Sequence, residues 1–386
     1  MASILRSLPF WPKGRKILVR GEVFEEADIT ADQKGHFERA ASVFRRKDIA
    51  AEEVVPGRWY LFACYGCPWA HRAIIARQLL GLEEAVPLVP TDGWWPFTRG
   101  LPALATGGWR TSRPLPPGAL ANATPELRAH AEALPFYFWR LYVATDAECT
   151  GRVTVPVLWD SAKVAVVNNE SADILGILNS APFKALGRSR PVDLRPKHLE
   201  KEIDELNERI YEFNNGVYRC GFAGTTDAFL DARVKVFKAI GFLEERLSTR
   251  RFLMGDSLTE CDVRCFTTLV RFDSAYYNAF RCNLGRIRGD FPNLQRYLSN
   301  LFEVEAFRES CRGMHYGYPL MYFMICRWQG RRLSNLLRLA EVTIFAILFA
   351  LAPDTPTWRH ALATCLCLPL RLLDRAVDPF PNAGWL

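Results

Sequence analysis

The sequence predicts a two-domain protein in which an α/β domain is followed by an all-α domain. Its 386 residues are enough for two domains of ordinary size. Short apolar runs alternate with helical patterns up to about residue 181, and from residue 197 apolar residues recur at spacings of three and four. The composition, with 49% hydrophobic and 24% charged residues, is that of a globular protein.

Charge and cysteine usage narrow the possible partners. Lys and Arg number 49 against 42 Asp and Glu, a net charge of +7 without a dense basic run, so no nucleic-acid partner is indicated. Eleven Cys are scattered along the chain, which favours reduced, buried thiols over a disulfide scaffold. The N-terminus lacks the apolar core of a secretory signal, and early Glu residues argue against a transit peptide. We expect a cytoplasmic protein.

The first elements come after residues 1–54, which show no clear period and are expected to form an extended N-terminal arm. The apolar, aromatic run Trp59–Cys64 predicts a buried strand. A helix is predicted over Trp69–Leu82, because Pro68 suits a first helical position and an apolar face follows it. Val86–Pro90 predicts a second strand.

A second group of elements follows a Gly- and Pro-rich insertion at about residues 103–135, which carries a predicted helix near Pro125–Leu134. Val153–Trp159 and Ala162–Val167 predict two strands, and Ala172–Leu178 predicts a helix. The order strand–helix–strand and then strand–strand–helix, over residues 55–181, is that of a thioredoxin-like domain. Periodicity alone does not decide this fold.

Helices dominate the predicted second domain, residues 197–320. Amphipathic patterns cover 199–213 and 227–247. Thr259 with Asp262 three residues later predicts a capping box that starts a further helix. Residues 321–386 form an atypical apolar tail in which Val342–Ala352 is shorter than the roughly 18–20 residues of a membrane span. A buried or docking helix is the favoured interpretation, and a membrane-associated tail is the alternative.

The chemically most informative stretch is Cys64-Tyr65-Gly66-Cys67-Pro68-Trp69-Ala70-His71-Arg72. Cys67 falls between a strand and a helix that begins at proline, where free N–H groups and the helix dipole favour an anion. We therefore expect Cys67 to have a lowered pKa and to act as a nucleophile. The alternative is an inert, buried cysteine.

The spacing of Cys64 and Cys67 leaves two interpretations open. In the first, the two cysteines form a dithiol redox pair. In the second, Cys67 is the sole nucleophile and Cys64 packs in the strand. The second is favoured, because Cys67 directly precedes the helix proline and Cys64 lies in the apolar run. A single C-x-x-C without a second ligand pair is a poor zinc site, so we expect no metal.

Two further pairs allow both a structural and a functional interpretation. A cis Val155–Pro156 bond would turn the Val155 backbone towards a thiol ligand, whereas an edge-strand proline needs no function. Glu170 and Ser171 open a helix. They either cap it or bind the amino-acid end of a peptide, with the helix start holding its carboxylate and Glu170 its ammonium.

The motifs CPWAHR, GRVTVPVLWD, VNNESADIL, NNGVY, LTECDVR and TLVRFD, in this order, resemble those of the glutathionyl-hydroquinone reductases. These are the Xi class of glutathione transferases, which are similar to the omega class. The resemblance covers about residues 37–318 and implies a thioredoxin-like domain followed by an all-helical domain. It also implies glutathione as co-substrate and a homodimer.

The resemblance assigns roles residue by residue. Cys67 matches the catalytic cysteine and Tyr218 the proton-donating tyrosine. Tyr276 and Tyr316 match further active-site tyrosines, Tyr316 within a loosely matching stretch. The glutathione-binding residues are expected to be Trp95 (or its neighbour Trp94), Arg152, Val153, Thr154, Val155, Glu170 and Ser171.

The implied reaction removes glutathione from glutathionyl-hydroquinones through a Cys67–glutathione mixed disulfide, with oxidised glutathione as product. Thiol transferase and dehydroascorbate reductase side activities are expected. Beyond residue 320 the resemblance ends, so the tail leaves two alternatives open. One is a redox-regulated, membrane-associating protein on the same fold, and the other is a non-catalytic binding module.

Overall fold

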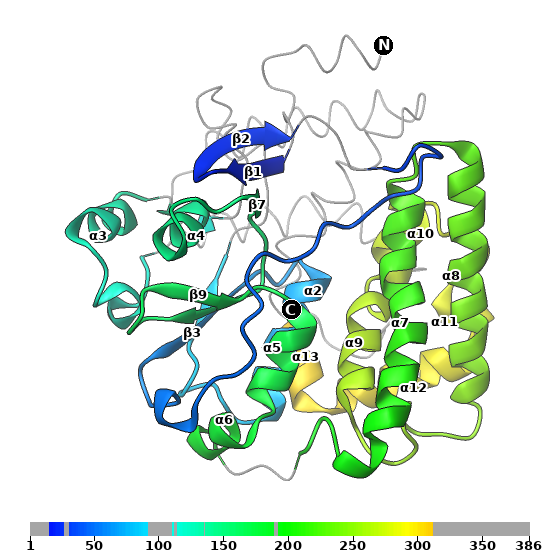
Figure 1. Ribbon diagram of the computed structural model, residues 1–386. Coiled ribbons are helices and arrows are strands. Elements are labelled where there is room, and N and C mark those ends of the chain that lie inside the picture. The colour runs from blue at the N-terminus through cyan, green and yellow to red at the C-terminus, as the bar shows by residue number, and fades with distance from the viewer. Residues whose placement is uncertain are drawn as a thin grey trace, which may run out of the picture.

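The computed structural model describes residues 15–26, 31–91, 110–111, 114–134, 136–188 and 192–311. An α/β domain and a helical domain lie side by side (Figure 1). This arrangement confirms the predicted fold class. The helices α2 and α5 of the first domain and α9 of the second meet at the boundary between the two.

The α/β domain is built on a mixed sheet with the strand order β4-β3-β8-β9. Its strands are β3 (Trp59–Ala63), β4 (Leu88–Pro90), β8 (Val157–Asp160) and β9 (Ala165–Asn168). β3 runs parallel to β4 and antiparallel to β8. Every residue of β3 and β8 is buried, which explains their near-continuous apolar sequence.

Three helices pack near this sheet: α2 (Pro68–Leu79), α5 (Ser171–Leu178) and α6 (Ala181–Leu186). α2 starts at Pro68, as predicted, but it is buried almost all round and not on one face only. The reason is that α2 contacts β3 and also packs against α5, α9 and α13. Charged residues of α2 are therefore inside the protein.

The N-terminal arm contains structure that the sequence analysis missed. β1 (Arg15–Val19) and β2 (Glu22–Glu26) form an antiparallel hairpin, and β1 also pairs with β7 (Gly151–Arg152). The turn residues Arg20 and Gly21 have φ of 49° and 76°, the positive values that a tight hairpin turn requires. The expectation of a merely extended arm is wrong here, because this hairpin is held by a strand far along the chain.

After the hairpin, residues 31–50 run from the helical domain across to the α/β domain (dark blue in Figure 1). The Gly224 amide donates to the Gly35 carbonyl at 2.8 Å, beside α8. Arg45 forms two hydrogen bonds with the Asp173 carboxylate of α5, at 2.7 and 2.9 Å. The arm thus ties both domains together.

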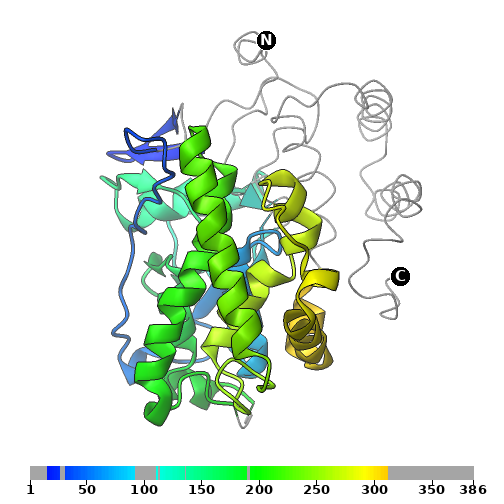
Figure 2. The same ribbon diagram turned by 90° about the vertical axis from the view of Figure 1, so that its right-hand side faces the viewer.

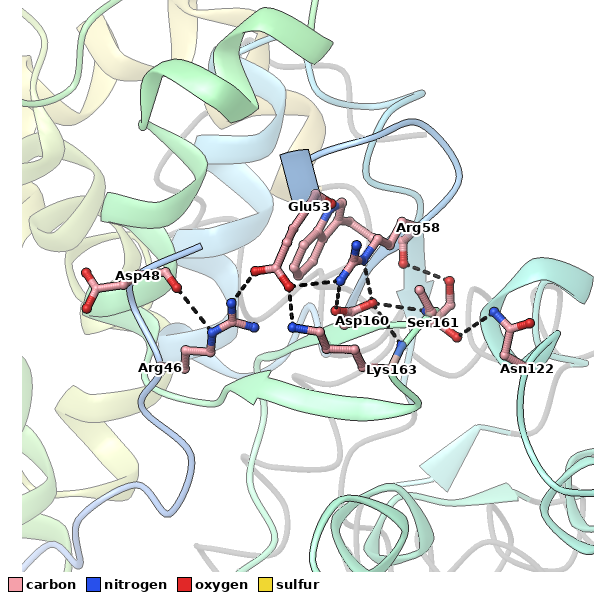
Figure 3. A network of polar contacts seen from close by, with 10 residues as sticks. Arg46, Asp48, Glu53, Arg58, Asn122, Asp160, Ser161 and Lys163 are labelled. Atoms are coloured by element: carbon pink, nitrogen blue, oxygen red, sulfur yellow. Dashed lines mark hydrogen bonds and ion pairs between the residues drawn. The ribbon is translucent and has the colours of Figure 1, made fainter. Parts of the chain in front are cut away.

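The arm ends in the polar cluster of Figure 3, around a short 3-10 helix, η1 (Ala51–Glu53). The Glu53 carboxylate contacts Arg46, Arg58 and Lys163, and Arg58 also forms two hydrogen bonds with buried Asp160, at 2.8 and 2.7 Å. The hydrogen bond from Lys163, with help from Arg46, lowers the pKa of Glu53 to about 2. The cluster fixes the arm to the β8–β9 turn.

The insertion carries the predicted helix, α3 (Pro125–Glu132), capped by the Thr124 hydroxyl. Beyond the prediction, the surrounding stretch contains η3 (Pro117–Leu120), β5 (Arg110–Thr111), β6 (Phe136–Tyr137) and α4 (Trp139–Thr145). The predicted strand over Val153–Trp159 is too long. β8 begins only at Val157, after the cis Val155–Pro156 bond.

Long helices form the second domain. α7 (Glu200–Gly221) and α8 (Thr226–Arg246) pack side by side along the domain (Figure 2). The remaining elements are η4 (Lys197–Leu199), α9 (Glu260–Leu269), the π-helical turn η5 (Phe272–Tyr276), α10 (Tyr277–Ala279), α11 (Ile287–Asp290), α12 (Pro292–Glu303) and α13 (Glu305–Cys311).

The predicted capping box at the start of α9 is confirmed. The Asp262 carboxylate accepts hydrogen bonds from the Thr259 and Leu253 amides and from the Tyr297 hydroxyl, at 2.8–2.9 Å. None of the helices in the described ranges is long and apolar enough to cross a membrane. The predicted tail, residues 321–386, lies outside those ranges.

Candidate active site

Cys67 lies where the sequence places it, at the N-cap of α2, after the short loop that follows β3. Its amide donates to the Cys64 carbonyl at 3.1 Å, which closes the tight loop between the two cysteines. The Cys67 Sγ atom is 3.9 Å from the Val155 carbonyl oxygen. The predicted cis peptide bond between Val155 and Pro156 is present.

The predicted lowering of the Cys67 pKa is wrong for this structure. Burial raises the pKa of the Cys67 thiol, and this effect exceeds the opposing ones. Hydrogen bonds from the Ala70 and Trp69 amides lower it, as the helix-start argument expects, and the charges of Arg271 and Arg39 act in the same direction. The desolvation of a thiolate packed against the core raises the pKa by more than the N–H groups at the helix start lower it.

Cys64 and Cys67 are both free cysteines. The Cys64 side chain is buried in the core, and burial raises its pKa to about 12. At neutral pH Cys64 is therefore a thiol, a poor nucleophile. The geometry supports Cys67 as the reactive member of the pair.

The start of α5 presents Glu170 as its N-cap and Ser171 as its first residue. One Glu170 carboxylate oxygen accepts from the Ala172 amide at 3.2 Å, and the other accepts from the Ser42 hydroxyl at 3.0 Å. Ser42 belongs to the N-terminal arm, so the arm helps to orient the Glu170 carboxylate. Ser171 is almost fully buried.

Residues 152–155 do not all face Cys67. Arg152 pairs with Ile17 in the small sheet. The amide and carbonyl groups of Thr154 both bond the Tyr142 hydroxyl, at 3.1 and 2.8 Å. Val153 is buried. Of the four residues predicted to contact glutathione, Val155 is the one whose carbonyl lies beside the Cys67 sulfur.

Two of the predicted tyrosines come together at the boundary between the domains. The rings of Tyr218, on α7, and Tyr276, at the end of η5, are 6.0 Å apart, and the Tyr218 ring is 6.1 Å from that of Trp69. Burial, followed by the nearby Cys67, raises the pKa of Tyr218. Tyr218 therefore keeps its proton at neutral pH.

Arg39 of the N-terminal arm covers this aromatic group. Its guanidinium lies 4.4 Å from the ring centre of Trp69 and 4.9 Å from that of Tyr218, and it donates to Asn215 at 2.8 Å. Such cation–π contacts fix the two rings relative to each other. The arm therefore contributes to the site at two points, Arg39 and Ser42.

A buried network supports the Cys67 loop from behind. The Arg271 guanidinium donates to the Tyr65 carbonyl at 2.7 Å, to the Thr267 carbonyl at 2.7 Å and to Nδ1 of His71 at 3.0 Å. Because arginine only donates, His71 accepts through Nδ1, and its Nε2–H faces the Ser310 hydroxyl at 2.8 Å. Burial, and then Arg271, lower the pKa of His71 well below 6.5, so the ring is neutral.

Trp94, Trp95 and Tyr316 lie outside the described residues, so their expected roles stay predictions. Among the side chains that the structure describes, no group of three or more His, Cys, Asp and Glu could hold a metal ion.

Sequence reasoning missed several polar residues of the site. Arg39 and Ser42 lie in an arm without periodicity, and no local signal marks them. Arg72 is different, because it closes the motif CPWAHR on a helix that follows a buried strand. Its spacing of five from Cys67 is a usable signal, but only the burial of nearly all of α2 shows that its charge is inside.

Comparison with known proteins agrees with this geometry. Residues 66–181 match the profile "Glutathione S-transferase, N-terminal domain", and residues 198–299 match "Glutathione S-transferase, C-terminal domain". The glutathionyl-hydroquinone reductase PcpF of Sphingobium chlorophenolicum is 41% identical over 72% of this chain and 82% of its own length. The glutathionyl-hydroquinone reductase YqjG of Escherichia coli is 36% identical over 74% of this chain and 84% of its own.

Solved structures extend the comparison. The Xi-class enzyme from Natrialba magadii superimposes with a TM-score of 0.63 at 33% identity, over 79% of this chain and 89% of that one. Glutathione-bound YqjG gives a TM-score of 0.59 at 32% identity, over 78% of this chain and 90% of that one. The chain belongs to the glutathione transferase family, within the Xi class that includes the glutathionyl-hydroquinone reductases.

Proposed function

We propose that this enzyme uses glutathione to reduce glutathionyl-hydroquinones to hydroquinones. The observation that carries the proposal is the placement of Cys67. Its sulfur lies beside the Val155 carbonyl, and Tyr218 is close enough for the charge on Cys67 to raise its pKa. The kinship with PcpF and YqjG, both named for this activity, supports the same reaction.

Glutathione is the expected co-substrate, and the site offers complementary groups for it. The Val155 carbonyl suits the backbone N–H of a cysteinyl residue whose sulfur lies at Cys67. The Glu170 carboxylate suits the ammonium of the γ-glutamyl group. The N–H groups at the start of α5, other than that of Ala172, which donates to Glu170, suit its carboxylate. Both YqjG and the Xi-class enzyme of Saccharomyces cerevisiae have been solved with glutathione bound.

The first chemical step is an attack by the thiolate form of Cys67, which the Ala70 and Trp69 amides and the charges of Arg271 and Arg39 stabilise against the effect of burial. Cys67 bonds to the sulfur of the conjugate, and the bond between that sulfur and the ring carbon breaks, with its electron pair passing to the carbon. Carbon leaves only if it gains a proton at the same time. Tyr218, held protonated by burial, supplies that proton and so releases the hydroquinone.

The second step restores the enzyme. A glutathione thiolate attacks the glutathione sulfur of the mixed disulfide, oxidised glutathione leaves, and Cys67 departs as the thiolate. The hydroquinone ring has then gained two electrons and two glutathione sulfurs have become a disulfide. Thiol transferase activity would use the same mixed disulfide, and we propose it as a side activity, with dehydroascorbate reduction.

The intermediate itself gives a direct test. We expect the protein mixed with a glutathionyl-hydroquinone, without free glutathione, to gain one glutathionyl group on the peptide that contains Cys67. Mass spectrometry measures it, and free glutathione should remove it. A modified Cys64, or a ring bound to the protein in place of glutathione, would contradict the mechanism. Size-exclusion chromatography with light scattering tests the homodimer expected from the family.

A further inference from the structure

Arg72 is a buried cation for which the described residues provide no ion-pair partner. Its side chain is 3% exposed, on the part of α2 that faces the start of α5. Nη1 lies 3.4 Å from the Ser171 hydroxyl, and the guanidinium stacks 4.3 Å from the ring centre of Trp69. Within the described residues its Nε atom has no hydrogen-bond partner, and no carboxylate forms an ion pair with it.

The charges nearby leave this cation only partly compensated. Arg264, whose charge acts on Arg72, is already paired with Glu260 at 2.8 Å. The Glu170 carboxylate is engaged by Ser42 and the Ala172 amide. Burial, together with Arg264, lowers the pKa of Arg72 to about 9, so the group is charged at neutral pH. A buried charge of this kind is costly unless an anion comes close.

The hydrogen-bond roles around Ser171 point to where that anion goes. Arginine only donates, so the Ser171 oxygen accepts from Arg72 and its own proton must point elsewhere. Among the described residues, its one acceptor is a Glu170 oxygen at 3.4 Å, the same length as the contact from Arg72. Arg72 therefore turns the Ser171 hydroxyl into a donor at the start of an eight-residue helix, where the N–H groups of the first turn have no partner within the helix.

We propose that Arg72 is a positioning residue that selects the α-carboxylate of the γ-glutamyl group of glutathione. It holds Ser171 as a hydrogen-bond donor, and it places a positive charge behind the start of α5. This inference rests on the proposed function. The amino-acid end of the ligand carries an ammonium and a carboxylate. Glu170 matches the first, and the Arg72–Ser171 pair matches the second.

The experiment compares two ligands. One is glutathione, and the other is the analogue with a γ-aminobutyryl group, which keeps the ammonium and lacks the α-carboxylate. Calorimetric titration measures both in Cys67→Ser protein, where no disulfide forms. We expect Arg72→Gln to weaken the binding of glutathione by about tenfold, the size of one charge-assisted hydrogen bond. The affinity for the analogue should stay within about twofold of its value without the substitution.

Arg77 supplies a matched control on the same helix. It is also buried, but its guanidinium bonds the Glu83 and Val86 carbonyls at the far end of α2. Arg77→Gln should lower thermal stability without changing the preference for glutathione over the analogue. If Arg72→Gln does not fold, Arg72→Lys, which keeps the charge but loses the planar fork, should reduce that preference by about threefold.

The inference would be overturned if the Arg72 variants bound both ligands more weakly to an equal extent, or if they bound neither ligand more weakly. Hydroquinone release by the enzyme with Cys67 intact is measured separately. Glutathione binding with the expected preference but without hydroquinone release would refute the proposed function and leave the role of Arg72 standing. Failure of the Cys67→Ser protein to bind glutathione would overturn both.

Discussion

Replacing Arg271 tests whether one buried guanidinium holds the Cys67 loop. It is fully buried and donates to the Tyr65 and Thr267 carbonyls and to His71. In Arg271→Lys a single ammonium replaces the planar fork and cannot reach all three acceptors. The charge stays, whereas the geometry is lost.

The magnitude follows from the number of hydrogen bonds. A hydrogen bond to a charged group contributes about 1.5–3 kcal/mol, and the lysine ammonium recovers part of what the fork loses. We expect Arg271→Lys to lower the free energy of unfolding by about 2–4 kcal/mol. For a chain of this size the melting temperature should fall by roughly 2–5 °C.

Two assays separate geometry from charge. Thermal unfolding measures the first, with exposed Arg251→Lys as a control that should change the free energy of unfolding by less than about 0.5 kcal/mol. The pH dependence of Cys67 alkylation by iodoacetamide, in a Cys64→Ser background, measures the second. Because the Arg271 charge lowers the Cys67 pKa, Arg271→Met should shift the alkylation curve to higher pH, whereas Arg271→Lys should not. Unchanged stability in both Arg271 variants would refute the supporting role.

Three further predictions concern titration and proton transfer. Folded His71 has a pKa well below 6.5, so below about pH 6.5 the unfolded chain takes up a proton that the native protein does not, and stability should fall. His71→Gln should flatten this slope when melting temperatures are measured against pH, and an unchanged slope would contradict the account. Glu53 has a pKa near 2 against 4.5, so its contribution is complete above about pH 4.5 and lost as the pH falls towards 2; acid unfolding of Glu53→Gln should lack this component. Tyr218→Phe should slow hydroquinone release by about 10²–10⁴-fold with glutathione affinity unchanged, whereas exposed Tyr211→Phe should keep the wild-type rate.

Local signals were sufficient for much of the fold. Pro68 at the start of α2 and the Thr259–Asp262 box at the start of α9 are short-range features, and both occur where predicted. Elements held by distant partners were missed. β1 and β2 depend on pairing with β7, and β8 is shortened because the cis bond at Pro156 interrupts the apolar run.

The site shows the same division. Cys67, Val155, Glu170 and Ser171 belong to motifs, and the structure places them near the starts of α2 and α5. The direction of the Cys67 pKa could not be predicted, because it depends on how much of the core surrounds the sulfur. The position of Arg39 could not be predicted either, because its contacts with Trp69 and Tyr218 join segments far apart in the sequence.

The central claim is that Cys67, and not Cys64, is the cysteine that carries the chemistry. The most direct measurement is glutathione-dependent release of hydroquinone from the glutathionyl adduct of menadiol, with wild type, Cys67→Ser and Cys64→Ser side by side. We expect turnover to disappear in Cys67→Ser and to persist in Cys64→Ser, whose thiol is buried with a pKa of about 12. Loss of turnover in both variants would point to a dithiol cycle, and no turnover by folded wild-type protein would contradict the assignment.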